Sequence, residues 1–312
     1  MQVSSSTHTA PDGAPLHVYR WAPDDDASTT RVAHLSHGMA EHAGRYARLA
    51  QSLTAAGFVV YANDHRGHGK TAKPEDLGHI GEAGSWGTLV GDLRSLVKKE
   101  KAAHPGLPFA LLSHSMGSFL AQELLFDLSD DLDAVVLSGT NGKPTPLAAA
   151  GRLVARAERL RLGARGHSKI LSGLSFDAFN KAFAPNRTEF DWLSRHEAEV
   201  DAYVADPHCG FPCSTSTWIE LLDALGRIAK PELQQRIKKT LPVYVFAGAE
   251  DPSNERTKGV RKLLGAYARA GLRDVTHKFY EGARHETLNE TNRDEVTGDL
   301  LAWLDAKLPP KG

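Results

Sequence analysis

The sequence predicts an α/β fold, in which a mainly parallel β-sheet carries helices on both faces and an inserted helical segment interrupts the alternation. Short apolar stretches typical of buried strands alternate with stretches whose apolar residues recur at helical spacing. The alternation stops after 134–138, and strand-like residues return only at Leu241. We therefore divide the chain into a first core part (1–140), an inserted cap (141–231) and a second core part (232–312).

The expected elements follow in chain order. An early strand at 17–21 pairs antiparallel with 4–9 across the turn Pro11-Asp12-Gly13. Apolar strands are then expected, with helices between them, at 31–36, 58–61, 109–112 and 134–138. After the insertion, strands at 241–248 and 275–280 flank a helix at 256–270.

The turn at Ser115 is the most informative local feature. An apolar strand ends just before the pentapeptide 113–117 (SHSMG), and helical spacing follows at 119–126. Such a sharp strand-to-helix turn holds a serine hydroxyl clear of the sheet and aims the first helical N–H groups at an anion forming there. The pattern is typical of a nucleophile elbow, with the small residue Ser113 in place of the usual first glycine.

Chain order then indicates an acid and a base. Asp251 follows the strand at 241–248, and His285 follows the strand at 275–280. The order serine, acid, histidine is the one that α/β hydrolases use, in which the imidazole accepts the serine proton and the carboxylate fixes its tautomer. The alternatives are a helix N-cap for Asp251, a surface position for His285, and Glu250 as the acid.

The first parallel strand supplies the remaining catalytic part. It runs directly into His37 and Gly38, so the backbone N–H of Met39 is expected to join that of Met116 in an oxyanion hole. Loss of one such donor typically costs about 3 to 4 kcal/mol of transition-state stabilisation. A plain glycine turn is the alternative.

The loop 64–69 contains two glycines and two imidazoles. We expect a tight loop that supports the site, with direct substrate contact as the alternative. His65 and His68 could suggest a metal, but no cysteine or carboxylate cluster completes a set of ligands nearby in the sequence, so no metal is expected.

Composition favours one enzyme without a nucleic-acid partner. The chain has 312 residues and a formal net charge of -1. No apolar stretch approaches 18 residues and the start lacks a signal-peptide pattern, so a cytoplasmic location is expected. Cys209 and Cys213 form neither a redox motif nor a disulfide framework, and we expect both to be reduced and partly buried.

The insertion is expected to determine substrate choice. Helical spacing predicts one apolar stripe, and the arginines of the same segment lie largely outside it. The stripe consists of Leu147, Leu153, Val154, Ala157 and Leu160. A basic amphipathic helix can contact an anionic membrane transiently, although an arginine-rich solvated face is the commoner explanation. Among the aromatic residues of the insertion, Phe179, Phe211 and Trp218 are candidates for substrate binding. The oligomeric state stays open.

Several segments together carry a resemblance: 37–46 (HGMAEHAGRY), 64–69 (DHRGHG), the turn at Ser115, 206–211 (DPHCGF), and the loops of Asp251 and His285. They resemble the bacterial monoacylglycerol lipase and lysophospholipase group of α/β hydrolases over nearly the whole chain. The resemblance implies an α/β-hydrolase fold with a cap, and a cofactor-free serine hydrolase of monoacylglycerols, lysophospholipids or simple carboxylic esters.

Carried over residue by residue, the resemblance places the triad on Ser115, Asp251 and His285 and the oxyanion donors on Met39 and Met116. Two positions depart from the group's pattern and bear on substrate preference. Ser113 stands in place of a glycine. Lys70-Thr71 follows Gly69, where the group commonly has a serine two residues after the glycine. Two alternative functions remain. One is a thioesterase or aminopeptidase that uses the same triad, and the other is a ligand-binding homologue that has lost catalysis.

Overall fold

The computed structural model describes residues 1–144 and 146–310, with side chains described for all of these except 26 and 146–149. Within these residues, eight strands form one sheet in the order β1-β2-β4-β3-β5-β6-β7-β8. The strands are β1 (Gln2–Thr9), β2 (Pro15–Ala22), β3 (Arg31–Ser36), β4 (Phe58–Asn63), β5 (Phe109–His114), β6 (Ala134–Ser138), β7 (Val243–Gly248) and β8 (Val275–Tyr280).

The sheet is antiparallel at one edge and parallel elsewhere. β1 pairs with β2 in the predicted hairpin, with Ser4 opposite Arg20, and β2 pairs antiparallel with β4. All pairings from β4 through β8 are parallel. Every residue of β3, β5, β6 and β7 is buried, as expected for parallel strands covered on both faces.

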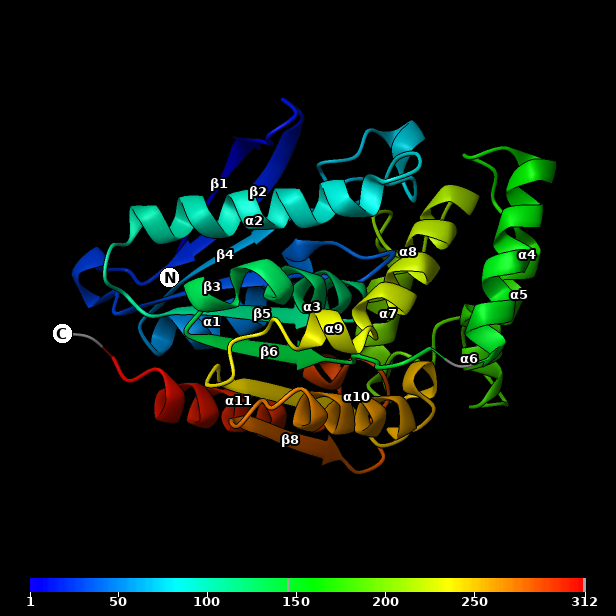
Figure 1. The fold of residues 1–312 in the computed structure, drawn as a ribbon. Helices are drawn as coiled ribbons and strands as arrows, with labels where there is room; N and C mark the ends of the chain where they lie inside the picture. Colours follow the sequence, from blue (N-terminus) through cyan, green and yellow to red (C-terminus); the bar gives the residue numbers. More distant parts are fainter. Residues whose placement is uncertain (145, 311–312) are drawn as a thin grey trace.

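Helices of the core cover both faces of the sheet (Figure 1). The helices α2 (Ser85–Ala103), α3 (Met116–Leu128) and α10 (Lys258–Arg269) contribute to one apolar cluster. The helices α1 (Ala47–Ala55) and α11 (Arg293–Lys307) contribute to a second cluster on the other face. The predicted α/β organisation is therefore confirmed, with strand bounds that match the expectation at 31–36, 134–138 and 275–280.

Where the structure describes the interval between β6 and β7, it contains helices and no strand apart from an isolated bridge between His167 and Ser214. These helices are α4 (Pro146–Leu162), α5 (Lys169–Leu174), α6 (Phe176–Lys181), α7 (Glu197–Ala205), α8 (Thr215–Ile228) and α9 (Pro231–Gln234). In Figure 1, α4 and α8 extend beyond the carboxyl ends of the parallel strands. We call this interval the cap.

Only part of the expected apolar stripe of α4 faces the core. Leu147 lies outside the described side chains, while Leu153 is 68% exposed and Leu160 91% exposed. Among the described side chains of this helix, Ala155 and Glu158 are buried and Val154 is partly buried against the main apolar cluster, because α4 packs on α8. Leu153 and Leu160 therefore lie on the outer surface of the cap, whereas Val154 of the same stripe packs inward.

Candidate active site

Ser115 lies at a strained turn between β5 and α3. Its backbone dihedrals are φ 50° and ψ −120°, a conformation that L residues rarely adopt and that is common at functional sites. The helix approaches the sheet so closely that a Cβ at Gly117 would lie 2.2 Å from the carbonyl oxygen of Ser36. Only glycine fits there. Ser113 fits because it is buried and its hydroxyl donates to the carbonyl oxygen of Val136 at 2.7 Å.

The structure brings Ser115, His285 and Asp251 together in one hydrogen-bonded chain. Ser115 Oγ lies 3.0 Å from His285 Nε2, and His285 Nδ1 lies 2.9 Å from Asp251 Oδ2. The acid follows β7 and the histidine follows β8, as the sequence order indicated. With the ring proton on Nδ1, His285 donates to the carboxylate and accepts from the serine hydroxyl, which is the arrangement needed for proton removal from serine.

Asp251 is fully buried, and each of its carboxylate oxygens accepts two hydrogen bonds. Oδ1 accepts from the backbone N–H and the hydroxyl of Ser253, at 2.9 and 2.7 Å. Oδ2 accepts from Asn254 Nδ2 at 2.8 Å and from His285. Glu250, the alternative acid, has a side chain 41% exposed and pairs with Arg256 instead.

Sequence reasoning missed Ser253 and Asn254 as partners of the acid. The hydroxyl of Ser253 also lies 3.1 Å from His285 Nδ1, so it contacts both the acid and the histidine. The available signal was the spacing of Asp251 and Ser253, because an aspartate often accepts the N–H of the residue two positions later in a turn.

The surroundings of His285 set its protonation. Burial alone would lower the pKa of His285, but the charge and hydrogen bond of Asp251, together with the charges of Glu286 and Glu41, raise it above its ordinary value. The ring of His114 lies 4.8 Å away between centroids, and burial followed by the charge of His285 lowers the pKa of His114 to about 4. His114 is therefore neutral at every pH at which His285 changes its protonation state.

The cap also contacts this histidine directly. The ring of Trp192 lies 4.8 Å from that of His285 at an interplanar angle of 31°. The carbonyl oxygens of Trp192 and Leu193 accept the backbone N–H groups of His285 and Glu286, at 3.4 and 2.8 Å. Trp192 belongs to the aromatic set of the insertion, but nothing in the sequence indicated that it packs on the histidine.

The loop after β3 presents the N–H of Met39 next to the turn. Within the described residues, neither Met39 nor Met116 donates its backbone N–H to a protein acceptor. The carbonyl of the Gly38–Met39 peptide accepts from His37 Nδ1 at 2.7 Å, since His37 Nε2 already accepts from the N–H of His65. This bond fixes the plane of the peptide that carries the Met39 N–H, which points opposite to the carbonyl.

Ala40, the next residue, has a left-handed backbone with φ 57° and is almost fully buried. For a residue with a side chain this conformation costs about 1–2 kcal/mol. The 64–69 loop lies beneath the same region: Asp64 accepts the N–H of Ala43 at 2.8 Å and that of Lys70 at 2.7 Å. These contacts agree with a supporting function for that loop.

A polar group of side chains lies beside Ser115. Arg45 donates to both oxygens of Glu286 at 2.7 Å and to Glu41 at 2.6 Å. Glu41 also accepts from Gly38 N–H at 2.6 Å and from the Tyr46 hydroxyl at 2.9 Å. Burial opposes ionisation of Glu286, but the charge and hydrogen bonds of Arg45 hold its pKa at about 2. Both carboxylates, Glu41 and Glu286, thus accept hydrogen bonds from the Arg45 guanidinium.

A cavity of about 310 Å³ opens onto Ser115, His285 and the polar group. Phe179 and Trp218 line it together with Phe176, Trp192 and other apolar residues of the cap. Phe211 is not among the lining residues, which corrects the expectation for that position. Its ring packs edge-on against His68 at 5.3 Å, because the N–H of the preceding Gly210 binds the carbonyl of Ala40 and turns the segment toward the loop.

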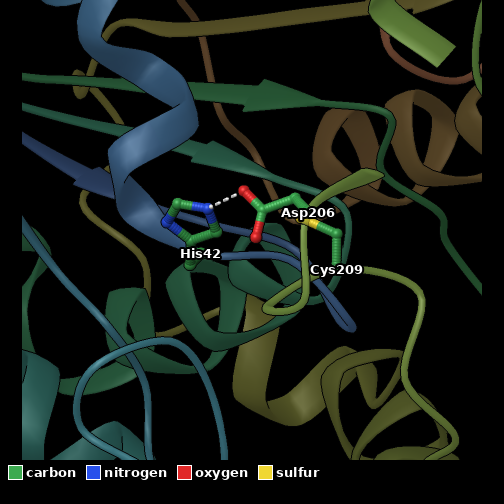
Figure 2. Close-up of side chains that lie close together, drawn as sticks. All are labelled: His42, Asp206 and Cys209. Atoms are coloured by element: carbon green, nitrogen blue, oxygen red, sulfur yellow. Dashed lines mark hydrogen bonds and ion pairs between the residues drawn. The ribbon is translucent and has the colours of Figure 1, made fainter. Parts of the chain in front are cut away.

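A second cluster beside the site brings together His42, Asp206 and Cys209, whose ligand atoms lie within 4.8 Å of one another (Figure 2). In the structure, the imidazole of this cluster is engaged in hydrogen bonds. His42 Nδ1 accepts the N–H of Gly44 at 3.2 Å, so the ring proton is on Nε2, which donates to Asp206 at 2.9 Å. Burial also raises the pKa of the Cys209 thiol. The cluster therefore acts as a hydrogen-bonded link between loop and cap.

Both cysteines, Cys209 and Cys213, are free and buried. Among the described residues, none of the helices has the length and apolar character needed to cross a bilayer.

Comparisons with known proteins place the chain in a family. The family described as serine aminopeptidase, S33, matches residues 27–292. Monoacylglycerol lipase of Mycolicibacterium smegmatis is 33% identical over 92% of this chain and 92% of that protein. Human monoglyceride lipase is 30% identical over 96% of this chain and 90% of that protein.

A solved structure supports the same placement. A thermostable carboxyl esterase from Bacillus coagulans, in complex with glycerol, superposes with a TM-score of 0.87 at 25% identity and covers 99% of both chains. The fold is therefore the α/β-hydrolase fold, as predicted. The chain belongs to the serine aminopeptidase S33 family of α/β hydrolases and is a serine hydrolase of carboxylic esters.

Proposed function

We propose that Ser115, His285 and Asp251 form the catalytic triad and hydrolyse monoacylglycerols, lysophospholipids or related acyl esters. The hydrogen-bonded chain from Ser115 Oγ to His285 and Asp251, on the wall of an apolar cavity, carries this proposal. Ser115 Oγ attacks the ester carbonyl while His285 Nε2 accepts its proton. His285 then protonates the departing alcohol, and the acyl-Ser115 ester is hydrolysed by water that His285 activates in turn.

The N–H groups of Met39 and Met116 are proposed to stabilise the tetrahedral oxyanion. Both lie in residues that line the cavity, and both are free of protein acceptors within the described residues. Met116 begins α3, so its N–H is one of the unpaired donors at a helix N-terminus, where the partial positive charge favours an anion.

The cavity suits an ester with one apolar and one hydroxylated part. Phe176, Phe179 and Trp218 offer an apolar surface to an acyl chain, while Glu41, His114 and Glu286 lie at the end next to the triad. The carboxylates there are engaged with Arg45, so they offer hydrogen bonds to hydroxyl groups rather than an unpaired charge to a substrate ammonium. This favours an alcohol-bearing ester over an aminopeptidase substrate. Several relatives are monoacylglycerol lipases or lysophospholipases, which supports the same class.

A substrate panel tests the class. We expect hydrolysis of monoacylglycerol, lysophospholipid and medium-chain p-nitrophenyl esters, with little turnover of aminoacyl p-nitroanilides or acyl-CoA thioesters. Preference for an aminoacyl anilide would replace the proposal by an aminopeptidase, and preference for acyl-CoA would replace it by a thioesterase. Absence of any turnover, with the fold intact, would favour a ligand-binding homologue.

We further propose that the cap, predicted at 141–231, selects the substrate and contacts a lipid surface transiently. Its outer surface exposes Leu153, Leu160, Ile170 and Leu174, the last of which also lines the cavity. An apolar surface that reaches the cavity at Leu174 would let an amphiphile pass directly from a lipid layer. Leu160→Asp should reduce co-sedimentation with phosphatidylglycerol vesicles and leave turnover of a water-soluble short ester unchanged. Equal vesicle binding by both proteins would refute the contact.

A further inference from the structure

The cap contacts the loop that carries Met39 through one residue in particular, Ala40. The carbonyl oxygen of Ala40 accepts two hydrogen bonds from the cap, from the Tyr203 hydroxyl at 2.7 Å and from the N–H of Gly210 at 2.9 Å. The His42–Asp206 bond joins the same two segments two residues further along the loop (Figure 2). Tyr203 is on α7, so a helix of the cap reaches the catalytic loop of the core.

Hydrogen bonds hold the backbone on both sides of Met39. On one side, Gly38 N–H donates to Glu41, and His37 donates to the carbonyl of the Gly38–Met39 peptide. On the other side, the only hydrogen bonds to the Ala40 carbonyl within the described residues come from Tyr203 and Gly210. The Met39 N–H therefore depends on the cap for one of its two supports.

The hydrogen bonds from the cap stabilise an unfavourable backbone conformation at Ala40. Its φ of 57° is unfavourable for a residue with a Cβ, so without the cap bonds the backbone at 40 would relax toward an ordinary conformation. Rotation there would reorient the Met39–Ala40 and Ala40–Glu41 peptides, and through Met39 it would shift the Gly38–Met39 peptide that carries the Met39 N–H. Tyr203 is buried against Phe190, with Arg45 over its ring, so its hydroxyl has a fixed position from which to hold the carbonyl.

We propose that Tyr203 is a positioning residue for the oxyanion hole: its hydroxyl holds Ala40 in the left-handed conformation that aims the Met39 N–H at the developing oxyanion. This inference rests on the proposed function of Met39. It assigns to the cap a part in the chemical step as well as in substrate choice. The phenol stays a donor, since burial raises the pKa of Tyr203 well above its ordinary value.

The test is the variant Tyr203→Phe, which removes the hydroxyl and keeps the ring. Because an oxyanion interaction is made only in the transition state, kcat should fall about tenfold with KM nearly unchanged. Affinity for a trifluoromethyl ketone, which forms an oxyanion on Ser115, should fall by a similar factor. The acidic limb of the pH profile should stay in place, because the triad is intact.

Two further variants separate positioning from general structure. Tyr267→Phe removes an equally buried phenol that has no partner and lies on α10, outside the cavity, so its kinetics should equal those of the wild type. Glycine adopts a positive φ without the steric cost. Tyr203→Phe should therefore reduce kcat less in an Ala40→Gly background than in the wild-type background.

An unchanged kcat in Tyr203→Phe, with its unfolding temperature also unchanged, would overturn the inference. A rise in KM alone would overturn it as well, because that result would show that the hydroxyl binds substrate. An equal loss of kcat in both backgrounds would exclude Ala40 as the route. If Ser115→Ala kept normal turnover, the proposed function itself would fail, which is a separate outcome.

Discussion

Asp251→Asn is the substitution that discriminates best between a triad acid and a capping aspartate. In the wild type, Asp251 accepts four hydrogen bonds, two at each oxygen, and has no exposed surface. Asparagine has one acceptor oxygen, so its amide N–H₂ group must face donors on one side. These are either the N–H and hydroxyl of Ser253 or the N–H groups of Asn254 and His285. In the second case His285 is forced into the tautomer with its proton on Nε2, which cannot accept the proton of Ser115.

The expected loss can be given a size. A wrong tautomer with otherwise intact geometry lowers kcat by about 10⁴, equivalent to about 5.5 kcal/mol in the barrier. The charge of Asp251 also raises the pKa of His285, so any residual activity should show an acidic limb at lower pH than the wild type. The assay is kcat and kcat/KM for a p-nitrophenyl ester from pH 5 to 9.

Glu250→Gln is the matched control, because it changes the same charge at the neighbouring, exposed position. Its kinetics should equal those of the wild type. The reasoning would be refuted if Asp251→Asn stayed within tenfold of wild-type kcat while remaining folded. Loss of activity in Glu250→Gln alone would identify Glu250 as the acid.

Three more outcomes are expected. Glu286→Gln should move the acidic limb of kcat/KM to lower pH, because the charge of Glu286 helps to raise the pKa of His285; a shift to higher pH would contradict that electrostatic account. Phe179→Ala or Trp218→Ala should weaken the preference for longer acyl chains, which an apolar wall favours by about 0.8 kcal/mol per buried methylene, whereas Phe211→Ala should leave the chain-length profile unchanged. Dialysis against EDTA should leave turnover unchanged, and inactivation reversed by added Zn²⁺ would show that the His42 cluster holds an ion after all.

The sequence predicted the features that depend on local pattern and chain order. Buried parallel strands contain continuous apolar runs, such as 109–112 in β5, so their positions could be read directly. Ser115, Asp251 and His285 follow three such strands, and parallel strands bring their carboxyl ends to one edge of the sheet. The placement of these three residues was therefore predictable, while their catalytic function stays a prediction.

Features that depend on packing between distant segments were not predictable. The stripe through Leu153 and Leu160 has helical spacing whether it faces the core or solvent, and only the packing of α4 on α8 decides between them. Phe211 was assigned to the cavity from its residue type, but a single backbone bond from Gly210 turns it toward His68. Likewise, the bond from Tyr203 to Ala40 joins residues 163 positions apart.

The central claim is that Ser115 forms the acyl intermediate, and active-site labelling tests it most directly. After reaction with a fluorophosphonate, peptide mass spectrometry should find one modified residue, Ser115, and Ser115→Ala should lose both the label and at least about a thousandfold of turnover. The unfolding temperature should stay close to that of the wild type, because the hydroxyl is not needed for packing. Label on Ser113, or near-normal turnover in Ser115→Ala, would contradict the account.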